Sequence, residues 1–178
     1  MSTIVLGVTG SIAAYKSCEL TRLFVQAEHN VHVVMTAAAT RFVTPLTLRT
    51  LSRNPVSADM FAEPAEWVPE HISLAARADL LVIAPCTANV IAKLAHGLAD
   101  DLLTATALAC KAPLLLAPAM NTAMWEHPAT QANVALLASR HARFVDADTG
   151  DLACGTSGKG RMAEPEAILK AATALLSS

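Results

Sequence analysis

Short apolar segments alternate with helix-like segments along almost the whole chain, and this alternation constrains the fold more than any other feature. The segments 3–8, 31–35, 80–84 and 114–117 are rich in Val, Ile and Leu and have the length of strands. The run at 80–84 is continuously apolar, as expected for a central strand of a parallel sheet covered on both faces. Strands that alternate with helices indicate βαβ units. The sequence therefore predicts an α/β, three-layer, Rossmann-like or flavodoxin-like fold.

The remaining segments are predicted to be helices, one short strand and two irregular stretches. The short strand is expected at 143–145. The irregular stretches are 54–70, which contains three prolines, and 146–162, which contains four glycines. An irregular segment as long as the second one is usually functional or disordered in a compact domain. The helices are expected at 11–27, 37–43, 46–51, 71–77, 88–95, 101–109, 128–139 and 164–176.

The bulk composition predicts one domain, 1–178, that associates with copies of itself. Hydrophobic residues make up 53% of the 178 residues and charged residues only 16%, so part of the surface is expected to be covered in an oligomer. The net charge is −2 and aromatic residues make up 4%, which gives no sign of nucleic-acid or membrane binding. The apolar stretch 102–120 is interrupted by Lys111, Pro113 and Pro118, and is therefore predicted to form helix, turn and strand rather than a membrane span.

The four cysteines have no CxxC spacing, and the six histidines have no metal-ligand spacing. This pattern argues against a zinc site or a disulfide framework, so no metal is expected. No secretory signal is evident at the start of the sequence, because the first apolar run has no basic region before it. A reducing cytoplasm is the expected location.

The first predicted strand ends in a turn of small residues, GVTGSIA (7–13), that leads into a helix. Gly10 permits a close approach to the backbone, and Ser11 can cap the helix. The free N–H groups and the dipole of a helix N-terminus favour phosphate. The turn is neither a full GxGxxG motif nor a P-loop, because Lys16 stands in the wrong place. It is interpreted as a phosphate site or as an ordinary glycine turn with a serine cap.

A second turn of small and polar residues, APCTAN (84–89), follows the central predicted strand. Thr87 is its expected N-cap, and Asn89 can donate or accept hydrogen bonds nearby. Cys86 is interpreted as a packing residue rather than a nucleophile. Two such turns on neighbouring strands favour a mononucleotide crevice at the carboxyl edge of the sheet.

The strand at 114–117 leads into PAMNTAMW (118–125), a segment that is poorly suited to a core. It offers Asn121, two methionines and Trp125 where an α/β sheet places its ligands. This segment is therefore a candidate for substrate recognition.

Two further side chains are candidates for proton transfer. His71 stands at the start of a predicted helix; a histidine is a natural general base, although a lone one there is more often a surface residue. Cys154 lies in a glycine-rich loop near Lys159 and Arg161, where an exposed thiol can be reactive or donate a proton. The glycines would let this loop close over a substrate.

Four separated segments resemble one family, the homo-oligomeric flavin-containing cysteine decarboxylases. They are GVTGSIAAYK, HI at 71–72 with ADLLVIAPCTAN after it, PAMNTAMW, and ACGTSGKGRMAEP. The flavin prenyltransferases, on a related fold, lack PAMNTAMW and the cysteine loop. The resemblance implies that FMN is the cofactor and that the family assembles as trimers, or as dodecamers of trimers, with the active site at a subunit boundary.

The resemblance also implies roles for individual residues. His71 and Cys154 would be catalytic, with Cys154 as the proton donor. Asn121 would bind the substrate carboxylate, and Met124 and Lys159 would also contact the substrate. Several relatives have a serine where Ala38 stands, so a hydroxyl contact at that position is missing here. FMN would be held by Gly10, Ser11, Ile12, Thr36, Ala38, Thr87, Ala88, Asn89, Val90 and Ala119.

The implied activity is that of a carboxy-lyase: FMN-dependent decarboxylation of 4′-phosphopantothenoylcysteine to 4′-phosphopantetheine in coenzyme A biosynthesis. The flavin would oxidise the carbon that bears sulfur to a thioaldehyde, CO2 would leave, and the enethiolate would be reduced. The resemblance also implies a partner, fused or separate: a ligase that joins cysteine to phosphopantothenate. Two alternatives remain: decarboxylation of the C-terminal cysteine of a lantibiotic peptide, and a non-catalytic flavin-binding regulatory subunit. The absence of an acidic run at 174–178 argues against the latter.

Overall fold

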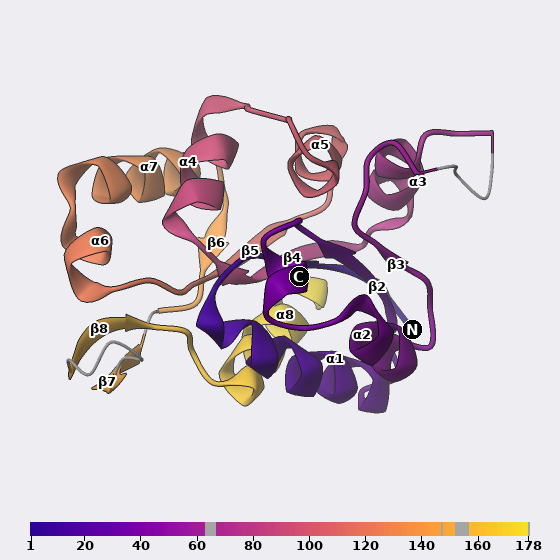
Figure 1. Cartoon of the computed structure of the whole chain (residues 1–178), viewed down its shortest axis with the longest axis horizontal. Coiled ribbons are helices and arrows are strands. Elements are labelled where there is room, and N and C mark those ends of the chain that lie inside the picture. Colours follow the sequence, from indigo (N-terminus) through magenta and orange to yellow (C-terminus); the bar gives the residue numbers. More distant parts are fainter. Residues whose placement is uncertain (63–66, 147, 152–156, 178) are drawn as a thin grey trace.

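The computed structural model describes residues 1–62, 67–146, 148–151 and 157–177, and its centre is a six-stranded parallel sheet (Figure 1). The strand order β3-β2-β1-β4-β5-β6 is that of the Rossmann fold, in which the order reverses between the first and fourth strands. This order confirms the predicted three-layer α/β class. The strands are β1 (Thr3–Val8), β2 (Asn30–Met35), β3 (Val56–Ser57), β4 (Leu80–Cys86), β5 (Leu114–Pro118) and β6 (Arg143–Phe144).

Helices cover both faces of this sheet (Figure 1). One face carries α1 (Lys16–Gln26), α2 (Pro45–Ser52) and α8 (Pro165–Leu176), and α1 packs against both of the others. The other face carries α3 (Glu70–Arg77), α4 (Ala88–His96), α5 (Leu102–Ala109) and α7 (Pro128–Ser139). Two short 3-10 helices, η1 (Ile12–Tyr15) and η2 (Ala39–Arg41), follow β1 and β2.

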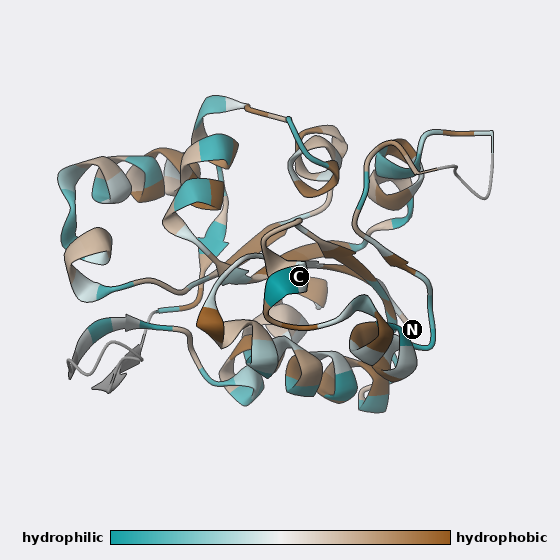
Figure 2. Ribbon diagram, viewed as in Figure 1, coloured by the Kyte–Doolittle hydropathy of each residue, from teal (hydrophilic) through white to brown (hydrophobic). Residues whose placement is uncertain are grey.

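The alternation of side chains along the strands divides the core into two layers. Leu6 and Val82 face α1 and α8, whereas Val5, Leu81 and Ile83 face α3, α4 and α5. All five are exposed by 1% or less, so the central strands are hydrophobic on both faces, as the brown colour of the sheet in Figure 2 illustrates. The continuous apolar run at 80–84 is therefore explained, as predicted, by the burial of β4 on both faces of the sheet.

Outside the sheet, a two-stranded hairpin stands beside α6 (Thr122–Glu126) (Figure 1). Its strands β7 (Asp148–Asp151) and β8 (Ser157–Arg161) are antiparallel, and Gly150 faces Gly158 across them. The prediction that all of 146–162 is irregular was therefore wrong. Glycine-rich strands pair through their backbones and leave no alternation of side chains in the sequence.

Two other elements were absent from the prediction. The short strand β3 lies inside the stretch 54–70, which was expected to be irregular, and α6 begins inside the recognition segment 118–125 and ends at Glu126. Both are too short for a hydrophobic period to show. The helix expected at 11–27 begins with the tighter turn η1 before α1.

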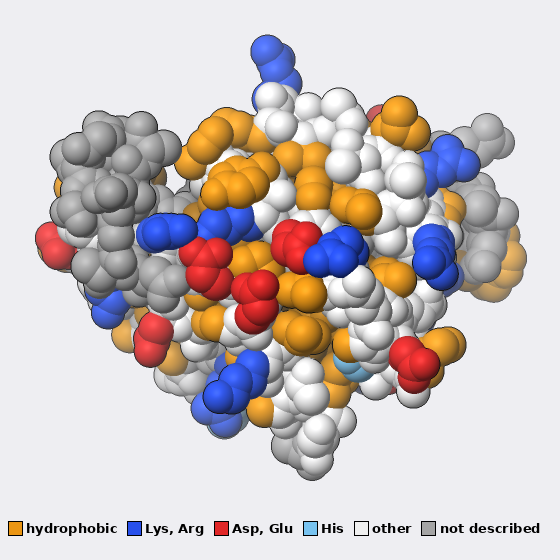
Figure 3. All heavy atoms as spheres, turned by 90° about the horizontal axis from the view of Figure 1, so that it is seen from below, with side chains coloured by type: hydrophobic (Ala, Val, Ile, Leu, Met, Phe, Trp, Pro, Cys, Tyr) orange, Lys and Arg blue, Asp and Glu red, His pale blue; other side chains and the backbone are white. Residues whose placement is uncertain are grey.

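On the face that α1, α2 and α8 form, the described side chains make no large field of one sign. Charged side chains of both signs are mixed there with hydrophobic ones, in agreement with the net charge of −2 (Figure 3). Among the described residues, every helix is too short or too polar to traverse a bilayer.

Candidate functional site

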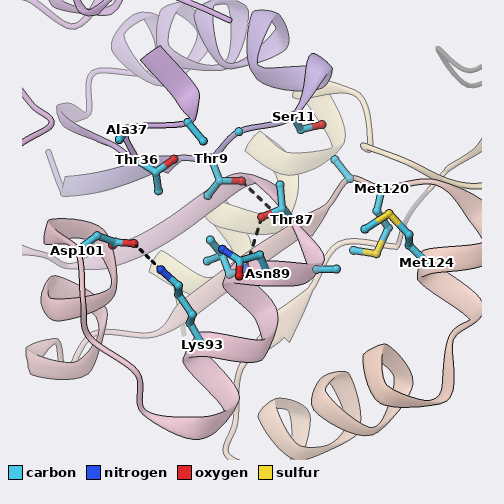
Figure 4. A pocket seen from close by; sticks show the side chains of 15 residues that line it. Thr9, Ser11, Thr36, Ala37, Thr87, Asn89, Lys93, Asp101, Met120 and Met124 are labelled. Atoms are coloured by element: carbon cyan, nitrogen blue, oxygen red, sulfur yellow. Dashed lines mark hydrogen bonds and ion pairs between the residues drawn. The ribbon is translucent and has the colours of Figure 1, made fainter. Parts of the chain in front are cut away.

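A cavity of about 670 Å³ opens where the strand order reverses, at the carboxyl ends of β1, β2, β4 and β5 (Figure 4). This is the position at which doubly wound sheets bind their ligands, and the volume is typical of a small-molecule site. The lining residues are Thr9, Gly10, Ser11, Thr36, Ala37, Ala38, Thr87, Ala88, Asn89, Val90, Lys93, Asp101, Ala119, Met120 and Met124.

Thr9 joins the first two turns of the cavity wall. Its hydroxyl donates a hydrogen bond to the carbonyl of Pro85 at 2.8 Å and accepts one from the amide of Thr87 at 3.2 Å. The residue is fully buried, so these two bonds satisfy a polar group that water does not reach. The turns after β1 and β4 are therefore held together by one side chain, which sequence reasoning did not identify.

Two capped helix starts face the cavity. The Ser11 hydroxyl accepts from the amide of Ala13 at 3.3 Å at the start of η1, which leads directly into α1. The Thr87 hydroxyl accepts from the amide of Val90 at 3.4 Å at the start of α4. The partial positive charge of helix N-termini attracts an anion without a charged side chain. This wall of the cavity is thus suited to phosphate.

Gly10 allows the turns after β1 and β2 to touch. A Cβ atom added at Gly10 would lie 2.5 Å from the Cβ of Ala38, closer than two carbon atoms can approach. This wall can therefore close only if position 38 has a small side chain and position 10 has no side chain at all. The contact gives Ala38 a packing role.

The lysine of the cavity is neutralised by neighbouring carboxylates. The Nζ atom of Lys93 lies 2.7 Å from Asp100 and 3.1 Å from Asp101, and these bonds, that to Asp100 first, raise the pKa of Lys93. Asp101 also caps α5, because it accepts from the amide of Thr104 at 2.8 Å. Figure 4 places this ion pair across the cavity from Met120 and Met124. Sequence reasoning missed Lys93 and Asp101, because they lie on different elements: Lys93 is in α4 and Asp101 is the N-cap of α5.

The recognition segment forms the opposite rim. Met120 and Met124 line the cavity, and Met124 is 50% exposed. Asn121 lies between them, is exposed, and accepts through Oδ1 from the amide of Ala123 at 2.8 Å, which starts α6. Lys159 is exposed on β8, the strand that packs beside this segment. Of the three predicted substrate residues, Met124 lines the cavity, whereas Asn121 and Lys159 lie on the neighbouring segment and strand and do not line it.

The cavity collects most residues that were predicted to hold the cofactor. Ile12 is the exception: it is 57% exposed on η1 and does not line the cavity. Cys86 is fully buried, and burial raises the pKa of its thiol far above the usual range, in agreement with a packing residue. The nine predicted residues that do line it are Gly10, Ser11, Thr36, Ala38, Thr87, Ala88, Asn89, Val90 and Ala119.

The two predicted catalytic residues are not brought to the cavity by the described part of one chain. His71 lies on α3, which packs against α5, and α3 and α6 are at opposite ends of the longest axis of the molecule (Figure 1). His71 does not line the cavity. Cys154 lies outside the described residues.

Comparison with known families supplies the identity of the fold. The chain matches the Flavoprotein family over residues 1–177. It belongs to that family. Among relatives of this flavoprotein is the "Coenzyme A biosynthesis bifunctional protein CoaBC" of Bacillus subtilis, which is 52% identical over 169 residues. That match covers 95% of this chain and 42% of the relative, so the chain spans less than half the length of the relative.

A second relative has almost the same length as this flavoprotein. The "Probable phosphopantothenoylcysteine decarboxylase" of Streptococcus mutans is 44% identical over 169 residues, which are 94% of each chain. Two solved structures share the fold at 33% identity. A PPC decarboxylase mutant complexed with pantothenoylaminoethenethiol superposes with a TM-score of 0.90 and 99% coverage of both chains. The FMN-dependent cysteine decarboxylase SpaF gives a TM-score of 0.81, with 97% of this chain and 98% of that one covered.

Proposed function

We propose that this flavoprotein binds FMN in the cavity and decarboxylates 4′-phosphopantothenoylcysteine to 4′-phosphopantetheine. The observation that carries the proposal is the joining of a phosphate-type wall and the recognition segment 118–125 around one cavity. The relatives named above act in coenzyme A biosynthesis or are FMN-dependent cysteine decarboxylases, and their similarity extends over nearly the whole of this chain.

The residues of the cavity fit FMN. The helix starts at Ser11 and Thr87 would hold the phosphate through their backbone N–H groups, since in the described part of the chain neither helix has an acidic residue in its first turn. Ala119 and Val90 offer small apolar surfaces to a flat ring system, and Met120 can adapt to it. The Thr36 hydroxyl, which accepts from the amide of Ala39 at 3.2 Å, would face the linking ribityl chain.

The flavin would supply a reversible acceptor for a hydride, which a simple thiol-bearing carboxylate needs before it can lose CO2. The chain itself would position the substrate. Asn121 would orient the carboxylate with an uncharged amide, which stabilises the ground-state charge less than an arginine would and therefore opposes its loss less. Cys154 would deliver the proton that completes the saturated thiol.

His71 would complete the site from a second copy of the chain. It is half-buried, and Ile72 beside it is 43% exposed, while Phe61 and Trp67 in the preceding segment are 87% and 93% exposed. Large apolar side chains exposed together favour an interface between copies. Assembly as a trimer, or as a dodecamer of trimers, would bring this surface to the cavity of a neighbour and would cover the apolar side chains.

A ligase domain or a separate ligase is the proposed partner. The CoaBC relative is described as bifunctional, and the chain spans 42% of its length. Such a ligase would make the phosphorylated cysteine conjugate that this flavoprotein consumes.

The experiment that tests this proposal is a competition between two substrate classes. Purified protein, with its flavin released and identified by mass, is incubated with 4′-phosphopantothenoylcysteine and with a peptide that ends in cysteine. We expect FMN and turnover of the small phosphorylated substrate alone. Turnover of the peptide alone would assign the chain to peptide maturation, and FMN without turnover of either would indicate a regulatory subunit.

A further inference from the structure

Lys16 is the only charged side chain that is buried in the described part of the chain. It is 7% exposed, it is the first residue of α1, and it does not line the cavity. Taking an ammonium group out of water costs several kcal/mol unless it is paired, so a buried lysine needs a compensating partner. Its position after the Gly10–Ser11 turn is wrong for a P-loop lysine, which leaves its role open.

The partner of Lys16 lies at the junction between the hairpin and the last helix. Its Nζ atom is 2.9 Å from Oε1 of Glu164 and 3.4 Å from the carbonyl oxygen of Met162. Lys16, and to a smaller extent Arg161, hold the pKa of Glu164 below its usual range. Glu164 is the residue immediately before α8, and Met162 and Ala163 beside it are exposed by 1% and 2%. The chain is thus fixed to the main body immediately after β8.

From this anchor, β8 runs along the recognition segment so closely that the two backbones are in contact. The amide of Met120 donates to the carbonyl of Gly160 at 2.9 Å. A Cβ at Gly160 would lie 2.4 Å from the carbonyl oxygen of Met120, and the φ angle of Gly160 is +135°, so only glycine suits this position. One residue pair on, a Cβ at Gly158 would lie 2.3 Å from the hydroxyl oxygen of Thr122. The register of β8 against 120–122 therefore leaves no space for displacement toward the cavity rim.

We propose that Lys16 is a positioning residue for the hairpin: its buried ammonium group fixes the β8–α8 junction to the start of α1, and thereby sets the register of β8 on residues 120–122. The turn before η1, which leads into α1, forms the wall of the cavity that would hold phosphate, and β8 carries Lys159. Lys16 would thus connect the cofactor end of the site to its substrate end. The inference deepens the proposed function and rests on it only for the catalytic readout described below.

The test is Lys16→Met, which replaces the ammonium group by an apolar side chain of similar length that can pack in a core. Because this change removes the buried charge and leaves Glu164 half exposed, global stability should change little. Hydrogen exchange at the amides of 157–161 and of Met120 should rise by about tenfold, since the junction loses its anchor. Flavin content should stay at the wild-type level.

Arg161→Met is the matched control. Arg161 pairs with the same carboxylate oxygen of Glu164 at 2.7 Å, but it is 42% exposed, so its loss should leave hydrogen exchange of the hairpin unchanged. Glu164→Gln tests the same pair from the other side: it keeps the buried ammonium group of Lys16 but removes the anion that pairs with it. That variant should lose global stability as well as hairpin protection.

The second readout is the product ratio in a single turnover of 4′-phosphopantothenoylcysteine. Cys154, the proposed proton donor, lies between β7 and β8 in the sequence, so a displaced hairpin should slow the last protonation and release oxidised enethiol in place of part of the saturated thiol. A merely unstable enzyme would make less of both products at an unchanged ratio. Cys154→Ser is the positive control, in which the enethiol should predominate.

Faster exchange at 157–161 together with a raised enethiol fraction in Lys16→Met, but not in Arg161→Met, would support the inference. Unchanged exchange in Lys16→Met would overturn it, and so would faster exchange with an unchanged product ratio. If the wild-type protein removes no CO2, the proposed function fails, and the hydrogen-exchange comparison still decides whether Lys16 anchors the hairpin.

Discussion

The carboxyl and amino edges of the sheet differ in which helix ends and which charged side chains they present. At the carboxyl edge, the cavity is formed by helix starts that Ser11 and Thr87 cap, and its lysine is paired with Asp100 and Asp101. At the amino edge, a second cavity of about 560 Å³ lies where β4, β5 and β6 begin and where α5 and α7 end. Four basic residues line it and, among the described residues, no acidic one does: Lys111, Arg140, His141 and Arg143.

A helix that ends at the amino edge explains one of these basic residues, Arg140. Helix C-termini carry a partial negative charge and unpaired carbonyls, which cations stabilise. Arg140 shows this directly, because its Nη1 atom donates to the carbonyl of Ala95 near the end of α4 at 2.8 Å. The edge that is richer in cations is therefore the weaker candidate for phosphate. In a parallel α/β sheet, the direction of the helices decides where an anion binds more than the number of basic side chains does.

The strongest test of this contrast is Asn121→Asp at the carboxyl edge. Aspartate caps a helix as well as asparagine does, so α6 should persist. A carboxylate next to the substrate carboxylate should cost several kcal/mol, and decarboxylation should fall by about a thousandfold or more while the flavin is retained. Initial rates and the flavin spectrum measure the two effects.

Asn133→Asp on α7 is the control for Asn121→Asp, because Asn133 lies outside the cavity lining and contacts His96. It should leave turnover within about twofold of the wild type, since surface changes are usually small. Wild-type activity in Asn121→Asp would remove Asn121 from the substrate site.

The second test is Gly10→Ala, which places a methyl group against Ala38. Overpacking of this kind should cost about 1–3 kcal/mol and separate the turns after β1 and β2, with loss of bound flavin. Gly97→Ala is the control: its φ is +69°, but nothing lies within 4 Å of an added Cβ. That variant should lose about 1 kcal/mol of unfolding free energy, because a side chain is strained at positive φ, and should keep its flavin. Equal flavin content in both variants would contradict the proposed wall.

A smaller effect is expected when one polar group is removed from each edge. Ser11→Ala removes a cap at the carboxyl edge and should lower the unfolding free energy by about 1 kcal/mol and weaken flavin binding. Arg143→Ala at the amino edge should leave the dissociation constant of the flavin unchanged. Titration of flavin-free protein with FMN compares the affinities of the two variants. A larger loss of affinity in Arg143→Ala than in Ser11→Ala would place the flavin at the amino edge instead of the carboxyl edge.

The last prediction concerns the acid stability of the Lys16–Glu164 pair. The folded-state pKa of Glu164 is lowered, so the pair stabilises the fold above the unfolded pKa of about 4.3, and this contribution disappears as the pH falls through the folded pKa. Urea unfolding from pH 7 down to pH 3 should therefore show the wild type and Glu164→Gln converging below about pH 4. A stability difference that persists in acid would contradict the charge pairing.

The sequence predicted two kinds of feature: strands with a recognisable apolar pattern, and binding residues that lie together in a single turn of the chain. Apolar runs such as 80–84 identified the central strands, and the turns 7–13 and 84–89 identified most of the cavity wall. Features that join distant segments were not predictable. Thr9 bonds residues 85 and 87, and Lys93 meets Asp101 through a turn, so neither contact leaves a period in the sequence. The roles of Asn121, His71 and Cys154 remain predictions.

The most direct measurement is the mass spectrum of 4′-phosphopantothenoylcysteine after incubation with the purified protein, with the visible spectrum of the protein recorded beforehand. We expect a yellow protein and a product that has lost one CO2 and retains a saturated thiol, 4′-phosphopantetheine. A yellow protein that leaves this substrate intact would contradict the proposed reaction and preserve only the flavin site at the carboxyl edge.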